Sequence, residues 1–432
     1  MNTLHTRRHF LRTTFLGGAA AWTVPAFLER TFFAMDARAA DSWVQTPLGH
    51  DSPILVVIQL AGGNDGLNTV IPLGADPYLR ARPRLGISAE KALRIDDSTG
   101  LNPVLTGIRD LYGRGEAAII QGVGYPNPNR SHFRSTDIWQ TASDADQVVQ
   151  DGWLGRYFDA CCSGEDATSG IAIGDREPLA FEGRTPSSIS FRQPGQLQLN
   201  AVDADEMDAM MGMEMSSGME TGTSGASIGH LPGSQGDMTA SLDFLMRVAM
   251  DARMGADKIR EVIGSFQTSV DFPKTRLGND LALVARLIGG SMPTRVYYAS
   301  QGGYDTHSNQ DGTHTRLLSE LDAALAAFAG EMRAQGNWSR VLVMTFSEFG
   351  RRVAENASGG TDHGAAAPLF VLGGGVRPGV HGMHPNLEKL DRGDLVHTTD
   401  FRRVYATILD RWLGAASHEI LRQKYPTLGF LG

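Results

Sequence analysis

The 432-residue chain has only two cysteines, Cys161 and Cys162, and they are adjacent. Neighbouring Cα atoms lie about 3.8 Å apart, which is less than the roughly 4.4–6.8 Å spanned by a relaxed disulfide. The pair therefore cannot join distant segments of the chain. We expect the stability of the fold to come from its hydrophobic core.

Basic residues are scarce after the N-terminus. Residues 1–39 hold five of the 39 Lys and Arg residues and two of the 48 Asp and Glu residues, which leaves 34 basic against 46 acidic residues. Because nucleic-acid binding depends on clustered Lys and Arg, this balance argues against a nucleic-acid partner. The acidic excess is compatible with a site in which carboxylates surround cations.

Long apolar runs are also missing beyond the N-terminus, where no stretch approaches the roughly 18 residues of a membrane-spanning helix. The N-terminus itself reads as an export signal, with the pair Arg7-Arg8, a weakly apolar stretch over residues 13–28 and small residues at Ala37 and Ala39. An uncleaved anchor is the alternative, but about 16 apolar residues are short for a hydrocarbon core of about 30 Å.

We therefore predict that residues 1–39 are a twin-arginine signal peptide, cleaved before Ala40. We expect the precursor to bind the twin-arginine export machinery. The mature chain, residues 40–432, is expected to be periplasmic or secreted and to have no stable membrane span.

Short β-branched runs alternate with helical periodicity along the mature chain. Strands are expected over residues 54–60, 117–121, 295–300, 341–346 and 369–372. Apolar residues at helical spacing mark helices around residues 277–287, 317–328 and 401–412. This alternation predicts an α/β domain whose mostly parallel central sheet is sandwiched by helices.

One segment departs from this pattern. Residues 203–238 combine several methionines with Asp, Glu, Ser and Gly. This composition favours a mobile surface insertion. A soft thioether site for Cu(I) is the alternative.

Polar residues gather just after three of the expected strands. Because ligands bind beyond the carboxyl ends of strands in open α/β sheets, we expect these residues to converge on one edge. Carboxylates and imidazoles together suit Zn²⁺, Mn²⁺ or another divalent cation. Taken singly, Asp305 could instead cap a helix, and Glu348 could pair with Arg351 on the surface. The candidate metal ligands are Asp65, Asp305, His307, Glu348, Asp362 and His363.

A further motif lies where an irregular loop turns helical, at Ser131. A hydroxyl at a helix N-terminus often serves only as the N-cap, but the same place attracts phosphate or sulfate. A nearby divalent cation could make the Ser131 hydroxyl a nucleophile. His132, with Arg130 or Arg134, could orient an anionic substrate, because Arg binds tetrahedral oxyanions bidentately.

Five motifs in this order resemble the secreted bacterial family called domain of unknown function 1501. They span about residues 50–415, and the family looks like a branch of the alkaline phosphatase superfamily, alongside sulfatases. The motifs are Gln59-Leu-Ala-Gly-Gly-Asn-Asp-Gly66, Arg130-Ser-His-Phe-Arg-Ser-Thr-Asp137, Gly303-Tyr-Asp-Thr-His307, Ser347-Glu-Phe-Gly-Arg351 and Gly360-Thr-Asp-His-Gly364.

The resemblance implies an alkaline phosphatase-like fold, one or two divalent metal ions (Zn, Mn, Mg or Ca) and hydrolysis of an anionic phosphate or sulfate ester. It also implies roles for individual residues. Ser131 would be the nucleophile, Asp305 and His307 would hold one metal, and Asp362 and His363 would hold the other, shared with Asp65.

The chain departs from the superfamily pattern at residues 365–368, Ala-Ala-Ala-Pro, where a further metal-binding histidine is common. His381, His384 and His397 follow later and could substitute, although surface or structural roles suit them better. The sequence thus predicts an exported metal-dependent hydrolase of phosphate or sulfate esters. The alternative is a non-catalytic periplasmic metal-binding or assembly protein that retains the fold.

Overall fold

A computed structural model describes residues 52–162, 168–197 and 251–432. The predicted signal peptide, residues 1–39, and the Met-rich segment, residues 203–238, both lie outside these residues. In the part of the chain that the structure describes, no helix is both long and apolar enough to cross a membrane.

A nine-stranded sheet forms the centre of the molecule, with the strand order β13-β5-β12-β9-β1-β8-β6-β7 and β16 pairing with β5. Its strands are parallel except β12, which runs antiparallel to both β5 and β9. Their bounds are β1 Ile54–Ala61, β5 Ala117–Gly124, β6 Gly170–Ile173, β7 Ser188–Phe191, β8 Val296–Gly302, β9 Val341–Phe346, β12 Ala367–Gly373, β13 Gly379–His381 and β16 Thr399–Asp400.

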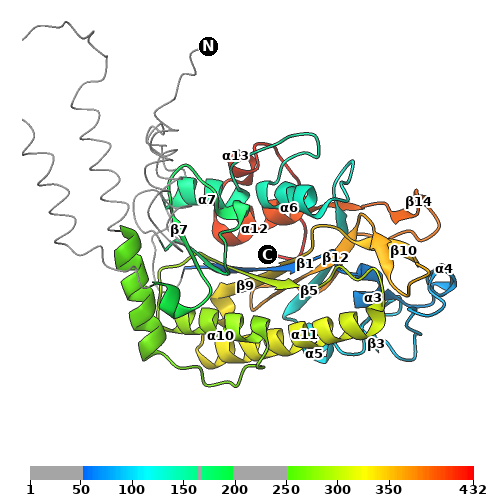
Figure 1. Ribbon diagram of the computed structural model, residues 1–432, viewed down its shortest axis with the longest axis horizontal. Helices are drawn as coiled ribbons and strands as arrows, with labels where there is room; N and C mark the ends of the chain where they lie inside the picture. The colour runs from blue at the N-terminus through cyan, green and yellow to red at the C-terminus, as the bar shows by residue number, and fades with distance from the viewer. Residues whose placement is uncertain (1–51, 163–167, 198–250) are drawn as a thin grey trace, which may run out of the picture.

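Helices cover both faces of this sheet (Figure 1). One face carries α5 Thr106–Gly113, α10 Arg276–Gly289 and α11 Gln310–Ala334. The other carries α6 His132–Thr141, α7 Trp153–Cys161, α12 Phe401–Ile408 and α13 Ser417–Ile420, and α12 continues into a π-helical turn at Leu409–Leu413. The predicted α/β architecture is confirmed.

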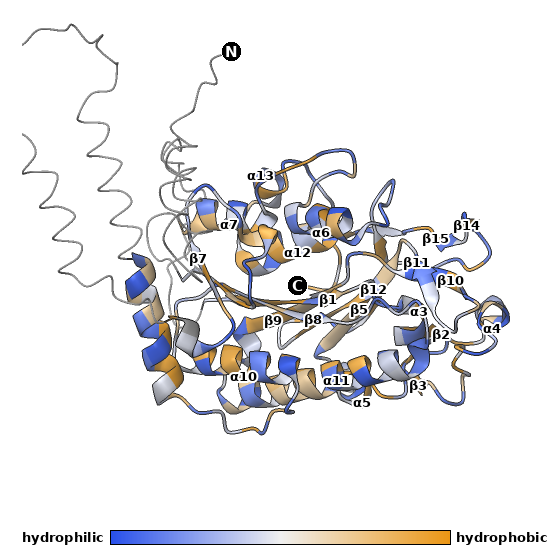
Figure 2. Ribbon diagram, viewed as in Figure 1, coloured by the Kyte–Doolittle hydropathy of each residue, from blue (hydrophilic) through white to orange (hydrophobic). Residues whose placement is uncertain are grey.

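Alternating side chains of β1 build the two hydrophobic cores. Ile54, Val56 and Ile58 pack into the core under α10 and α11, whereas Leu55 and Val57 pack into the core under α7 and α12. Because successive side chains of a strand point to opposite faces, a strand covered by helices on both sides must be apolar throughout. Figure 2 shows these central strands in hydrophobic colours. This double burial explains why the β-branched runs identified the strands.

The remaining elements are short. They comprise α3 Gly66–Thr69, β2 Val70–Pro72, α4 Asp76–Ala81, β3 Leu93–Arg94, β4 Thr99–Leu101, β10 Arg351–Glu355, β11 Thr361–His363, β14 Leu390–Asp391 and β15 Asp394–Leu395, with short 3-10 turns at Leu179–Phe181, Pro194–Leu197 and Trp338–Arg340. β10 and β11 form an antiparallel hairpin, which places Arg351 opposite His363.

The two cysteines bond to each other at the end of α7, with Cα atoms 3.8 Å apart. As expected, this disulfide joins no distant segments.

Candidate metal centre

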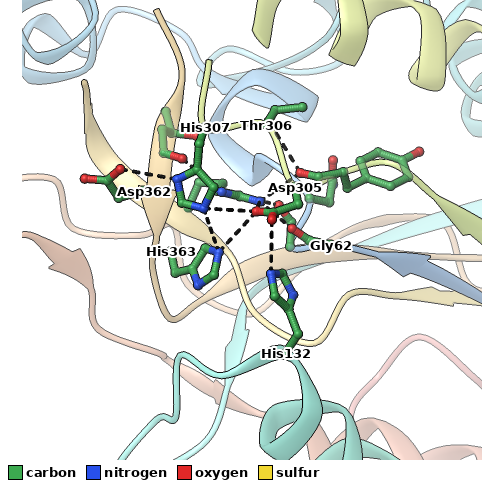
Figure 3. Close-up of polar contacts among 12 residues, drawn as sticks. Gly62, His132, Asp305, Thr306, His307, Asp362 and His363 are labelled. Carbon is green, nitrogen blue, oxygen red and sulfur yellow. Dashed lines mark hydrogen bonds and ion pairs between the residues drawn. The ribbon is translucent and has the colours of Figure 1, made fainter. Parts of the chain in front are cut away.

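Four histidine and aspartate side chains from separate segments meet at the carboxyl end of the sheet (Figure 3). Asp305 and His307 follow β8, His363 ends β11, and His132 opens α6. β1 pairs in parallel with both β8 and β9, so the loops after these three strands emerge side by side. The fold therefore brings together residues from positions 132 to 363.

Three of the facing atoms form a small triangle. His307 Nε2 lies 2.9 Å from His363 Nε2. Asp305 Oδ1 lies 3.1 Å from each of these nitrogens. Ligand atoms about 2.0–2.1 Å from a tetrahedral Zn²⁺ are about 3.3 Å from one another. The triangle is therefore within a few tenths of an ångström of one face of a zinc tetrahedron.

His132 approaches the same group from the opposite side of Asp305. Its Nε2 atom is 3.5 Å from Asp305 Oδ2. Ligand atoms of His132, Asp305 and His363 all lie within 4.8 Å of one another. His307 is outside this group of three but faces Asp305 and His363, so the centre offers imidazole and carboxylate donors that fit Zn²⁺ or a similar divalent cation.

The tautomer of His363 is set by the backbone. Its Nδ1 atom lies 2.8 Å from the carbonyl oxygen of Arg130, and a carbonyl can only accept a hydrogen bond. Nδ1 must therefore carry the proton, which leaves a lone pair on Nε2 when the ring is neutral. An imidazole held in this way is the usual form of a metal-binding histidine.

The buried carboxylate of Glu348 orients the ring of His132 in the same way, through its Nδ1 atom. Glu348 Oε1 lies 2.8 Å from His132 Nδ1 and also accepts the backbone N–H of Gly62 at 2.8 Å. The Nε2 atom of His132 is buried and has no hydrogen-bond partner in the described structure. The ring of Phe349 packs against both His132 and His363, with centroids 4.9 and 4.6 Å away. A nitrogen so oriented and left without a partner is suited to bind a cation.

Arg351 joins the loops after β1 and β8 to the β10–β11 hairpin through hydrogen bonds to their backbone carbonyls. Its sequence motif does not reveal this role. Its side chain is fully buried and donates to the carbonyl oxygens of Gly62, Gly63, Tyr304 and Thr361. It also binds Asp305 Oδ1 at 2.8 Å. The predicted alternative, a surface pair between Arg351 and Glu348, is wrong, because the guanidinium is enclosed by carbonyls and Glu348 faces His132.

Asp305 is a strong acid in this setting. Partial burial acts to raise its pKa, but the hydrogen bonds and charges of Arg351 and the hydrogen bond of His363 outweigh this and lower the pKa to about 2. The carboxylate is therefore ionised at any physiological pH. The backbone beside it is close-packed, since Gly62 has a φ of +121° and a Cβ atom there would lie 2.4 Å from the Asp305 nitrogen.

Asp362 lies behind His307 rather than within the triangle. Its Oδ1 atom is 3.4 Å from His307 Nδ1 and accepts a hydrogen bond from Asn356 at 3.2 Å. The hydrogen bond from Asn356 lowers the pKa of the Asp362 carboxyl. In this arrangement Asp362 and Glu348 orient histidines, and this contact differs from the direct metal contact predicted for them.

Asp65 does not join the group. Its carboxylate is 1% exposed, forms a 2.6 Å ion pair with Arg82 and accepts a hydrogen bond from Gln310. Burial acts to raise the pKa of Asp65, but Arg82 outweighs this and the pKa lies below its usual range. A protein cation thus occupies the position beside this carboxylate that the sequence assigned to a metal.

The residues predicted to handle substrate are placed differently from one another. Ser131 is exposed and is the N-cap of α6, without a side-chain cap hydrogen bond. Asn309, not Asp305, caps α11. Arg134 donates to the backbone carbonyls of residues 144, 145 and 147. Arg130 pairs with Asp394.

The later histidines occupy other surroundings. His381 Nε2 contacts the carbonyl of Arg377 at 3.1 Å, and His384 Nε2 contacts Thr99 Oγ1 at 2.8 Å. Burial lowers the pKa of His397. Ala366 at the departure from the superfamily pattern is buried among apolar residues. None of these contacts in the described structure involves His132, Asp305, His307 or His363.

Comparison with known proteins identifies a family. The profile of a family described as "Protein of unknown function (DUF1501)" matches residues 116–418, which is more than half of the chain. No curated protein matches the chain.

Several solved structures have a similar fold. Ps i-CgsB in complex with k-i-k-neocarrahexaose is 11% identical, with a TM-score of 0.37, over 87% of this chain and 75% of that one. The PsFucS1 sulfatase from Pseudoalteromonas sp. is 9% identical, with a TM-score of 0.37, over 93% and 74%. A protein in the alkaline phosphatase superfamily from Vibrio parahaemolyticus is 9% identical, with a TM-score of 0.32, over 83% and 71%.

Proposed function

This chain belongs to the DUF1501 family of proteins of unknown function, and we propose that it is an exported metal-dependent hydrolase of phosphate or sulfate esters. The observation that carries the proposal is the convergence of His132, Asp305, His307 and His363, with two of the imidazoles oriented through Nδ1. A divalent cation held by these residues would polarise an ester oxygen and stabilise the charge that develops on it.

Two arginines beside the centre favour an anionic substrate. Arg130 and Arg352 both approach the carboxylate of Asp394, which is buried, while their own side chains remain 34% and 39% exposed. Two guanidinium groups share one carboxylate, so one positive charge remains. The charge of Arg352 reaches the centre, since it contributes to lowering the pKa of Asp362, which lies beside His307. A phosphate or sulfate group would interact favourably with it.

Ser131 is the nucleophile in this proposal. It directly precedes His132 at the N-terminus of α6, where the helix dipole favours an anionic group. Its Oγ would attack phosphorus or sulfur, the bond to the ester oxygen would break, and the departing alcohol would take up a proton. Water would then release phosphate or sulfate from the serine.

The test uses purified residues 40–432. Elemental analysis should find a divalent metal, and p-nitrophenyl phosphate or p-nitrophenyl sulfate should be hydrolysed. His363→Ala should lose both metal and activity, whereas Ser131→Ala should lose activity and retain metal. His384→Ala is the matched control, because this histidine contacts Ser98 and Thr99 instead of the centre.

The outcomes separate the two candidate functions. Metal binding without hydrolysis of any ester would favour a non-catalytic metal-binding or assembly protein. Retention of full activity by Ser131→Ala would remove the serine nucleophile from the proposal.

Export is the second part of the proposal and rests on Arg7 and Arg8. The paired guanidinium groups are the feature that the twin-arginine receptor reads. Replacing both with Lys should retain the precursor in the cytoplasm, as measured by cell fractionation. Normal periplasmic appearance of this variant would point to a different export route.

A further inference from the structure

Gln310, the first residue of α11, joins the two segments that carry most of the metal centre. Its side chain is completely buried. Its amide oxygen accepts hydrogen bonds from Thr306 Oγ1 at 3.0 Å and from Thr361 Oγ1 at 2.6 Å. Thr306 stands between Asp305 and His307, and Thr361 precedes Asp362 and His363. One side chain therefore links the loop after β8 to the β10–β11 hairpin.

Asp65 holds the other end of this amide. Gln310 Nε2 donates to Asp65 Oδ2, which also accepts from Arg82 Nη1 at 2.6 Å. Arg82 in turn donates to the carbonyls of Val353 at 2.8 Å and Arg352 at 2.9 Å, both in β10. The network thus runs from the end of β1 through Asp65 and returns to the hairpin that bears His363.

The chemistry of these groups permits only one orientation of the amide. An ionised carboxylate accepts hydrogen bonds and donates none, so the NH₂ group of Gln310 must face Asp65. The amide oxygen is then directed at both threonine hydroxyls. Since all four side chains are buried, no water competes for these bonds.

We infer that Asp65 and Gln310 are positioning residues, which fix Thr306 and Thr361 and thereby set the spacing of His307 and His363. The inference rests on the proposed metal centre, where the two Nε2 atoms are 2.9 Å apart. It gives Asp65 a role in the site through hydrogen bonds instead of direct metal contact. Groups that hold ligands in place typically change metal affinity about 10–100-fold when they are replaced.

The main test is the variant Gln310→Glu, in which a second carboxylate meets Asp65 and the donor is lost. Zn²⁺ affinity, measured by competition with a chromophoric chelator, should fall about 10–100-fold. An affinity equal to that of the wild-type protein would overturn the coupling.

A second variant covers the case in which Gln310→Glu does not fold. Gln310→Met keeps the length of the side chain and removes its hydrogen bonds. The control is Asp322→Asn on the same helix, because Asp322 is similarly buried but accepts from Gly107 and Ile108, at the start of α5. Gln310→Met should weaken Zn²⁺ binding, whereas Asp322→Asn should lower stability alone.

Histidine ring NMR of the metal-free proteins separates this inference from the proposed function. The ring ¹H–¹⁵N signals of His307 and His363 should shift in Gln310→Met and stay in place in Asp322→Asn. Unshifted signals in Gln310→Met would overturn the positioning role. Failure of the wild-type protein to bind any metal would overturn the proposed function, and the NMR result would still decide the positioning role.

Discussion

Two carboxylates that follow neighbouring strands of the sheet have opposite surroundings. Asp65 comes after β1 and is fully buried, with Arg82, itself buried, as its ion partner. Asp305 comes after β8 and is 47% exposed, with three imidazoles around it as well as Arg351. Both groups have a lowered pKa, so both are negative at neutral pH.

The difference lies in the groups that surround each carboxylate. Around Asp65 the protein supplies its own cation and its own amide donor. Around Asp305 the Nε2 atoms of His307 and His363 face each other at 2.9 Å, and the buried Nε2 of His132 has no hydrogen-bond partner in the described structure. A strand-end carboxylate is therefore a candidate ligand when it is partly exposed and imidazole nitrogens face it, even with a buried arginine beside it, and a structural group when it is itself buried against an arginine.

The largest expected loss of stability comes from breaking the ion pair of the buried Asp65 region. Arg82→Met should destabilise the protein by about 3–5 kcal/mol, because it leaves the Asp65 charge buried without its ion partner. The free energy of unfolding in urea measures this change. Arg316→Met is the control, since Arg316 pairs with Glu320 on an exposed face of α11. It should cost less than about 0.5 kcal/mol. Equal losses in the two variants would contradict the contrast between the regions.

The parts of this contrast that depend on local pattern were predictable from the sequence. The strands at residues 54–60 and 341–346 were predictable because both of their faces are buried, which demands an unbroken apolar run. Asp305 and His307 were predictable because they directly follow the parallel strand β8, and His363 because it belongs to the Asp-His pair before the strand expected at 369–372. These signals need only the order of residues along single segments.

The rest depends on contacts between segments that share no spacing. Arg82 meets Asp65 from a loop 17 residues away, and Arg351 is satisfied mostly by backbone carbonyls, which every residue possesses. Gln310 in the first turn of a helix reads as a surface residue until Thr306 and Thr361 are seen beside it. His132 was predicted to orient substrate, since nothing in its own segment reveals that Glu348 turns its Nε2 toward Asp305.

A smaller effect sharpens the contrast through pH. His314 donates from Nε2 to Asn64 Oδ1, at 2.9 Å, beside the Asp65 network. Burial lowers its pKa from 6.5 to about 4. Between these values the unfolded chain binds more protons than the folded one, so stability falls as the pH is lowered from 6.5 toward 4. The loss attributable to His314 is roughly 2–3 kcal/mol.

Urea unfolding at pH 7 and pH 4.5 tests this expectation. His314→Gln still presents a donor to Asn64 but cannot be protonated. Its stability should therefore depend less on pH than that of the wild-type protein, by roughly 2 kcal/mol over this interval. If both proteins lose stability equally, the acid sensitivity arises from other groups.

The smallest expected effect on stability belongs to the exposed region. His307 is 46% exposed, and its contacts are Asp362 at 3.4 Å, Asp305 and the facing nitrogen of His363. In metal-free protein His307→Ala should change the free energy of unfolding by no more than about 0.5 kcal/mol, because polar interactions at an exposed ring contribute little to stability. Removing the ring also removes the 2.9 Å contact between the Nε2 atoms of His307 and His363.

The same variant should behave differently once Zn²⁺ is added. A ligand that binds only the folded protein stabilises it according to its concentration relative to Kd. Wild-type protein should therefore gain stability with Zn²⁺, and His307→Ala should gain much less, because one of the donors that face Asp305 is missing. Unfolding in urea, with Zn²⁺ or with a chelator, measures the stability of each protein with and without metal.

A loss of stability above about 1 kcal/mol in His307→Ala with the chelator would make His307 a structural residue. An undiminished gain with Zn²⁺ would remove it from the metal centre. Arg82→Met should show the opposite pattern, because most of its loss of folding stability should remain when a chelator is present. The two variants together separate the buried Asp65 region from the exposed Asp305 region.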